Sequence, residues 1–516
     1  MLLLDFLALG VAFALATAYL TKRRRRGLPL PPGPKPLPLV GNLFDFPTQK
    51  PWVTYDKWGK TYGDILSLNA LGNTIVVVNS AHVARELLDK RGTVYSDRPT
   101  VPFLDMMGMD FHLALAHYPH PWRVRRKLID RSFRHSAMLQ YRGVQTTKSH
   151  QFLKQLLDSP EAFPSHITHC IGSMLMTIAY DYEIKESNDH YMAINDEATR
   201  IATESFLPGA AIVNNLPFLK HFPGWLPGMG FKARAERGCE LYKEIVNMPF
   251  AHVKLQMRNG TARPSFTADN LTAYQALLGP GDQGIHMETE IKNAAATLYA
   301  AGIDTTGTTV NTFFLMLASY PDVQLKAQAE LDAVVGRDRL PDWEDHDQLP
   351  YIEAVCKELM RWQPATPLGV AHATTEDDVY EGYFIPKGTI VFANTWAMLQ
   401  DPSVYPSPQT FNPDRHLDSE GQVIDDPLLS SAFGFGRRVC PGRHVAESTL
   451  WFLVASVLAT FNVSKAVDDL GQEIPIEVDF SDGLVSMPKP FKCSIAVRDD
   501  LARQHIQAIA IAAKKA

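Results

Sequence analysis

The chain has 516 residues, of which 46% are hydrophobic and 21% are charged, and its formal net charge is −6. This composition is typical of a globular protein with a substantial core, and the negative charge gives no reason to expect nucleic-acid binding. The five cysteines are scattered and odd in number, which argues against a disulfide framework or a zinc site and favours a reducing compartment.

The N-terminus is predicted to be a membrane anchor. Residues 1–21 are largely apolar, about the length that spans a bilayer, and the cationic run 22–26 follows at once. Because flanking positive charge stays in the cytosol, the rest of the chain is expected to face the cytosol. A cleaved signal peptide is the alternative, although its charge would precede the apolar run. Residues 22–40 are basic and proline-rich, which predicts an extended hinge.

One large helical domain is predicted over residues 41–500, because no linker or repeat divides them. A β-hairpin is expected over residues 64–79, with a turn at Gly72-Asn73. An apolar helix of about 30 residues, 290–319, is long enough to run through the core. Further helices are predicted at 81–90, 121–133, 145–157, 189–205 and 231–259, and further strands at 379–384, 389–393, 474–478 and 492–497. The fold class is therefore mainly α with a smaller β part, and the tail 501–516 remains unassigned.

Residues 216–229 are apolar and aromatic but broken by proline and glycine. Two interpretations stay open: a lid that dips into the membrane beside a substrate entrance, or a loop packed on the domain.

Polar residues inside the long apolar helix are the next notable feature. Asp304 and Thr305 follow Ala301-Gly302-Ile303, and buried polar groups are costly unless they are used. A threonine here can also bond a carbonyl one turn back, so a kinked helix with no catalytic role is the alternative.

The stretch 433–442, Phe-Gly-Phe-Gly-Arg-Arg-Val-Cys-Pro-Gly, is the most informative part of the sequence. Glycines let the backbone approach a large flat ring, and arginines can neutralise acidic groups on it. A helix starting near Pro441 would point its free amides at the sulfur of Cys440 and favour the thiolate. The pattern predicts one thiolate presented to one metal cofactor.

This pattern, Phe433-x-x-Gly-x-Arg-x-Cys-x-Gly442, resembles the haem-ligand loop of the cytochrome P-450 family, the haem-thiolate monooxygenases. The resemblance extends over essentially the whole chain and implies the cytochrome P-450 fold, behind an N-terminal transmembrane helix. It also implies haem b as cofactor, with Cys440 as the iron ligand. Stretches such as Arg361-Trp362-Gln363-Pro364 look like those of fungal enzymes of secondary metabolism.

The resemblance also assigns roles to other residues. Asp304 and Thr305 match the oxygen-activation segment, where they would relay protons and bind dioxygen. Glu358, Arg361 and Arg415 would form a buried network that braces the Cys loop, and His416 is interpreted as a tolerated departure. The remaining cofactor contacts implied are Trp122, Arg126, His372, Phe433, Arg438 and Gly442. The substrate pocket implied contains Phe103, Met106, Met107, Tyr299, Ala301, Val370 and Leu484.

The expected activity is oxidation of a lipophilic small molecule with O2 and electrons from an NADPH-cytochrome reductase, at the endoplasmic reticulum membrane. Cations after Trp122 would dock the reductase, although such a run is more often a solvated face. Two other functions stay open: a haem-thiolate isomerase or dehydratase that needs no O2, and a non-enzymatic haem carrier or sensor.

Overall fold

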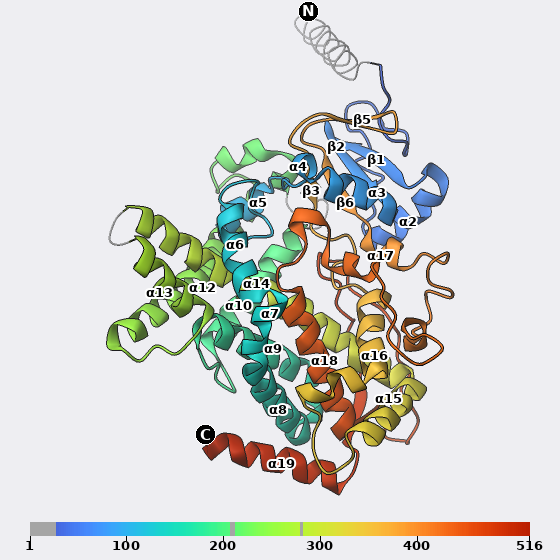
Figure 1. Cartoon of the computed structure of the whole chain (residues 1–516). Helices are drawn as coiled ribbons and strands as arrows, with labels where there is room; N and C mark the ends of the chain where they lie inside the picture. The colour runs from blue at the N-terminus through green and yellow to red at the C-terminus, as the bar shows by residue number, and fades with distance from the viewer. Residues whose placement is uncertain (1–26, 207–211, 279–281, 516) are drawn as a thin grey trace, which may run out of the picture.

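The computed structural model describes residues 27–206, 212–278 and 282–515 (Figure 1). The expected membrane anchor, residues 1–21, lies outside this part. Among the helices that the structure describes, none has both the length and the hydropathy needed to cross a bilayer.

A helical body carries a small β-region at the end near the N-terminus (Figure 1). The main sheet has the order β1-β2-β6-β3. Strands β1 (Ile65–Ala70) and β2 (Asn73–Val78) form the expected hairpin, and β2 pairs in parallel with β6 (Ile390–Ala393), far along the chain. The short pairs are β4 (Asp378–Tyr380) with β5 (Tyr383–Ile385), and β7 (Phe461–Lys465) with β8 (Cys493–Val497); β3 is His372–Ala373.

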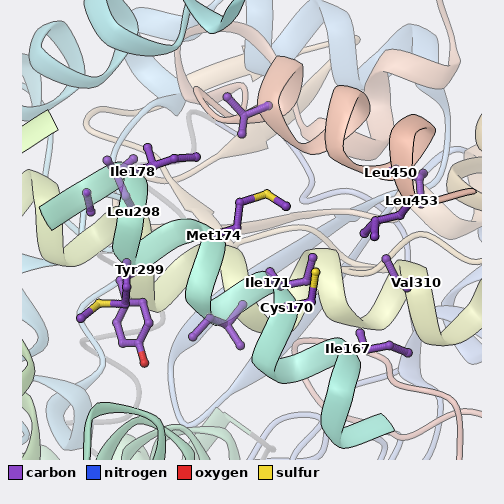
Figure 2. Close-up of a cluster of buried hydrophobic side chains, with 14 of the residues drawn as sticks. Ile167, Cys170, Ile171, Met174, Ile178, Leu298, Tyr299, Val310, Leu450 and Leu453 are labelled. Atoms are coloured by element: carbon purple, nitrogen blue, oxygen red, sulfur yellow. The ribbon is translucent and has the colours of Figure 1, made fainter. Parts of the chain in front are cut away.

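The helices enclose one long central helix, α14 (Asp282–Ser319). It packs against α9 (Phe163–Tyr180) and α18 (Arg443–Thr460), whose apolar side chains meet in the core (Figure 2). A Cβ on Gly302 would lie 2.7 Å from the side chain of Leu175, so glycine lets α14 and α9 approach closely. Other helices are α2 (Pro51–Tyr62), α5 (Pro102–Met106), α6 (Trp122–Phe133), α8 (Arg142–Asp158), α10 (His190–Phe206), α12 (Phe231–Asn259), α13 (Phe266–Leu278), α15 (Pro321–Val334), α16 (Pro350–Trp362), α17 (Thr395–Leu399) and α19 (Asp500–Lys515).

Some local predictions were wrong. The strand expected at 474–478 does not form, and the preceding residue Glu473 makes only an isolated bridge to Val467. The strand expected at 379–384 is instead a hairpin, because Glu381 and Gly382 adopt positive φ angles of 48° and 81° and turn the chain. The unassigned tail is helix α19, which packs against α8 and buries Ala502 and Ile506.

Candidate functional site

A cavity of about 320 Å³ lies where α6, α9, α14 and the Cys loop meet. Its lining includes Ala301, Gly302 and Thr305 from α14, together with Cys440 from the loop before α18. The two most distinctive stretches of the sequence, more than 130 residues apart, are therefore brought to one cavity.

The Cys loop is held by its own backbone. The amide of Cys440 donates to the carbonyl of Phe433 at 2.8 Å. Gly436 has a φ of 51°, and a Cβ there would lie 2.4 Å from the carbonyl oxygen of Leu88, so only glycine fits. Helix α18 begins at Arg443, two residues beyond the predicted start. Burial raises the pKa of the Cys440 thiol, while the Gly442 amide and the nearby Arg126 act in the opposite direction.

A buried ionic network lies behind this loop. Glu358 and Arg361 are both fully buried, and Arg361 donates to both carboxylate oxygens at 2.7 and 2.9 Å. The Nε of Arg415 donates to Glu358 at 3.2 Å, so the predicted trio is assembled. His416 joins it, with Nε2 at 2.9 Å from Oε2 of Glu358. Burial raises the pKa of Glu358, but the bonds to His416 and Arg361 outweigh it, and the net shift is downward.

Several cations line the cavity. Arg438 is buried, donates to the carbonyls of Ser96 and Ala116, and lies 4.7 Å from the ring centroid of Trp122. Arg98 is also buried and donates to the carbonyls of Ala114, Val370 and Ala371 at 2.7 Å each. Among the described residues, neither arginine has a carboxylate within ion-pair distance, and burial lowers the pKa of both. Two buried cations without counter-ions fit a ligand that carries two acid groups.

Two more lining residues complete this region, Arg126 and His372. Arg126 pairs with Asp130 at 2.7 Å and also donates to the carbonyl of Val439. His372 has Nδ1 at 2.8 Å from the carbonyl of Tyr95. Burial and the nearby Arg98 and Arg438 hold the pKa of His372 well below its usual value, so the imidazole is neutral, and Nδ1 carries its proton.

The polar pair on α14, Asp304 and Thr305, points in two directions. The hydroxyl of Thr305 donates to the carbonyl of Ala301 at 3.0 Å. Asp304 does not line the cavity but faces α10, where burial and the charge of Asp196 raise its pKa to about 6, opposed by a hydrogen bond from Thr199. Such a carboxyl can both take up and release a proton near neutral pH.

The family model for cytochrome P450 matches residues 31–495. The chain belongs to the cytochrome P450 family. Cytochrome P450 members bind a haem through a cysteine thiolate, and the residues of the cavity suit a haem. Glycines let the backbone lie close to a flat ring, Cys440 is the one cysteine of the described lining, and two buried arginines can pair with two acid groups.

Fungal monooxygenases are among the similar proteins. Cytochrome P450 monooxygenase 208 of Postia placenta is 40% identical over 480 residues, which cover 92% of this chain and 91% of that protein. Cytochrome P450 monooxygenase COX2 of Coprinopsis cinerea is 41% identical over 471 residues, covering 91% and 89%. Tryptamine 4-monooxygenase of Psilocybe cyanescens is 38% identical over 467 residues, covering 89% and 91%. The chain is a cytochrome P450 monooxygenase, and this class uses O2, a substrate and a reductase.

The structure brings together the cofactor residues proposed for this cytochrome P450 from its sequence. Trp122, Arg126, His372, Phe433, Arg438, Cys440 and Gly442 all line the cavity. Arg98 and His112 line it too and were missed, because nothing in the sequence around them distinguishes them from loop residues. A charged residue that the fold buries can be found only once the fold is known.

The predicted substrate pocket is placed only in part. Ala301 and Val370 line the cavity of this cytochrome P450, whereas Phe103, Met106, Met107, Tyr299 and Leu484 are not among its lining residues. Tyr299 faces away because its hydroxyl donates to the carbonyl of Tyr191 at 3.2 Å. Met107 instead fills the space beside Gly238, where a Cβ would lie 2.4 Å from its methyl group.

Proposed function

We propose that this monooxygenase binds haem b through Cys440 and oxidises a lipophilic small molecule, with electrons from an NADPH-cytochrome reductase. The observation that carries the proposal is the shared cavity, whose lining combines Cys440 with Ala301, Gly302, Thr305 and Thr306 of α14. Trp122, Arg98, Arg438 and His372 would surround the acid groups of the haem, and Phe433 and Gly442 would flank the sulfur.

A haem bound to a cysteine thiolate supplies the activation of dioxygen that inserts one oxygen atom into a substrate. The chain's own contribution is proton delivery. Asp304 can pass a proton from solvent because its pKa of about 6 lies close to neutrality. The Thr305 hydroxyl, now bonded to Ala301, would turn to hold that proton within the cavity. Gly302, two residues before Asp304, lets α14 lie close against Leu175 of α9.

Exposed cations on the surface near the Cys loop support docking of an acidic reductase. Helix α6 exposes Arg123, Lys127 and Arg131, and the Cys loop itself exposes Arg437. Arg437 and Arg123 both donate to the Tyr118 hydroxyl, which ties the loop and helix into one surface. A cationic surface raises the association rate of an anionic partner, an effect that salt weakens.

Exposed apolar side chains support a single-pass anchor in the endoplasmic reticulum membrane, with the domain in the cytosol. Phe218, Phe222 and Trp225 are 55%, 44% and 80% exposed, in the segment for which a membrane-dipping lid was one interpretation. Leu39 and Phe44, close to the N-terminal end, are 88% and 79% exposed. Apolar surface of this kind is unfavourable in water and suits a lipid interface.

A role in fungal secondary metabolism is supported by similar monooxygenases from fungi, one of which is named tryptamine 4-monooxygenase. The test is incubation of the full-length protein with a fungal NADPH-dependent reductase, a fungal lipid extract and 18O-labelled O2. A product that carries one labelled oxygen and requires NADPH is expected. A product formed without label or NADPH would favour an isomerase or dehydratase, and no product from any extract would favour a carrier or sensor.

A further inference from the structure

The charges around the cavity restrict what the cavity can accept. Its described lining contains Arg98, Arg126 and Arg438 but no aspartate or glutamate. The described lining therefore offers no carboxylate to pair with a protonated amine, and an unpaired ammonium in an apolar site is strongly unfavourable. A substrate carboxylate gains little either, because Arg126 is already paired with Asp130 and the two others match the acid groups of the haem.

His112 is a lining residue whose hydrogen bonding is incomplete. It follows the short turn Met109–Phe111, and its Nδ1 accepts a hydrogen bond from the amide of Ala114 at 3.2 Å. A nitrogen that accepts from an N–H carries no proton, so the ring proton is on Nε2. Among the described residues nothing accepts a hydrogen bond from Nε2.

The imidazole is held neutral and in place. Burial and the charge of Arg125 lower the pKa of His112 to about 4, so the ring stays uncharged at neutral pH. Its ring centroid lies 5.9 Å from that of Phe111. His112 is therefore a fixed, neutral donor at the cavity wall.

Three hydroxyl groups of the cavity lining on α14 already have hydrogen-bond partners. Thr297 donates to the carbonyl of Asn293 at 2.9 Å and accepts from the amide of Leu113 at 3.1 Å. Thr309 donates to the carbonyl of Thr305 at 3.2 Å, and Thr305 to that of Ala301. These threonines satisfy helix carbonyls, whereas the N–H of His112 stays available for a ligand.

We propose that His112 donates a hydrogen bond to an oxygen of an uncharged substrate, so that the cavity selects neutral, oxygen-bearing lipophilic molecules over amines. This inference rests on the proposed function, because it concerns the same cavity. It assigns His112 as the residue that orients the substrate and names the substrate class.

The experiment is a spectral titration of the full-length ferric haem protein, which follows the shift of the Soret band on ligand binding. Two matched pairs of probes are used: the ketone nootkatone against the hydrocarbon valencene, and the alcohol tryptophol against the amine tryptamine. Three variants are compared with the natural chain. His112→Phe removes the donor, His112→Gln keeps an N–H donor, and His117→Phe is the control, because His117 lies in the same segment but is exposed and bonded to Asp97.

In the natural protein, tryptophol is expected to bind about tenfold or more tightly than tryptamine. His112→Phe is expected to weaken nootkatone binding about three- to tenfold, the value of one hydrogen bond, and to leave valencene within about twofold. His112→Gln should recover part of the loss, and His117→Phe should change neither probe.

The inference would be overturned if His112→Phe weakened the binding of nootkatone and valencene equally. It would also be overturned if neither nootkatone nor tryptophol shifted the Soret band of the natural protein, or if tryptamine bound more tightly than tryptophol. A changed reduction potential or haem content in His112→Phe with unchanged probe affinities would also overturn it, since the ring would then serve the haem. The reduced, carbon-monoxide-treated spectrum is recorded for every variant. If the natural chain lacks the red-shifted band of thiolate ligation, the proposed function fails. If that band is present but His112→Phe leaves the preference for nootkatone over valencene unchanged, this inference alone is rejected.

Discussion

His416 lies with its Nε2 at 2.9 Å from Oε2 of Glu358, inside the buried network behind the Cys loop. Both side chains are almost completely buried. Glu358 thus receives hydrogen bonds from Arg361, Arg415, His416 and the amide of Asn412. A residue that the sequence left without a role therefore satisfies one lone pair of the central carboxylate.

Replacement of His416 by Phe should destabilise the protein by about 1–3 kcal/mol, because a buried carboxylate oxygen loses a hydrogen bond. The measurement is the thermal midpoint for loss of the reduced carbon-monoxide spectrum. His505→Phe is the control, since His505 lies on α19, outside this network, and its Nε2 donates to the carbonyl of Arg337. If both variants melt alike, His416 contributes no more than a surface histidine.

Removal of the Thr305 hydroxyl should uncouple electron supply from product formation. Thr305→Ala is expected to release more hydrogen peroxide and to give several-fold less product per NADPH, because the proton is no longer held within the cavity. Thr308→Ala, on the same helix but buried outside the cavity lining, is the control. Unchanged coupling in Thr305→Ala would count against a role in proton delivery.

Asp304 should make coupling depend on pH. Burial raises its pKa to about 6, so the carboxyl holds its proton below that pH and loses it as the pH rises. Product per NADPH is expected to fall as the pH increases through about 6, and Asp304→Asn should give a low value that changes little with pH. The same raised pKa means that Asp304 favours folding most below about pH 4 and that this contribution is lost as the pH rises through 6. A wild-type pH profile retained in Asp304→Asn would exclude this group as its origin.

Arg98 should be needed for haem retention although the sequence did not single it out. Arg98→Gln removes one of the two buried cations without a carboxylate partner, and the haem-to-protein ratio after purification is expected to fall by at least half. Arg85→Gln, an exposed arginine bonded to the carbonyl of Pro427, should retain full haem content. Full occupancy in both variants would show that Arg98 does not bind the acid groups.

The sequence predicted those features that local patterns determine. The hairpin β1–β2, helix α12 and the long core helix α14 follow from alternation, periodicity and apolar length. The Cys loop was recognisable because glycines with positive φ and close backbone contacts, such as Gly436 against Leu88, demand particular residues at fixed spacing.

Features that depend on distant contacts could not be predicted. Arg98 lines the cavity because it reaches the carbonyls of Val370 and Ala371, more than 270 residues further on. Tyr299 was assigned to the pocket by its position in the sequence, but its side chain turns toward Tyr191. Such orientations are decided by tertiary packing, which one sequence does not encode in any local pattern.

Ligation of a haem iron by Cys440 is the central claim, and the reduced, carbon-monoxide-treated spectrum tests it most directly. The natural protein is expected to show the strongly red-shifted Soret band of thiolate ligation. Cys440→Ser should lose this band, whereas Cys493→Ser, a change at a cysteine in strand β8 away from the cavity, should retain it. A red-shifted band that persists in Cys440→Ser, or its absence from the haem-loaded natural protein, would contradict the account.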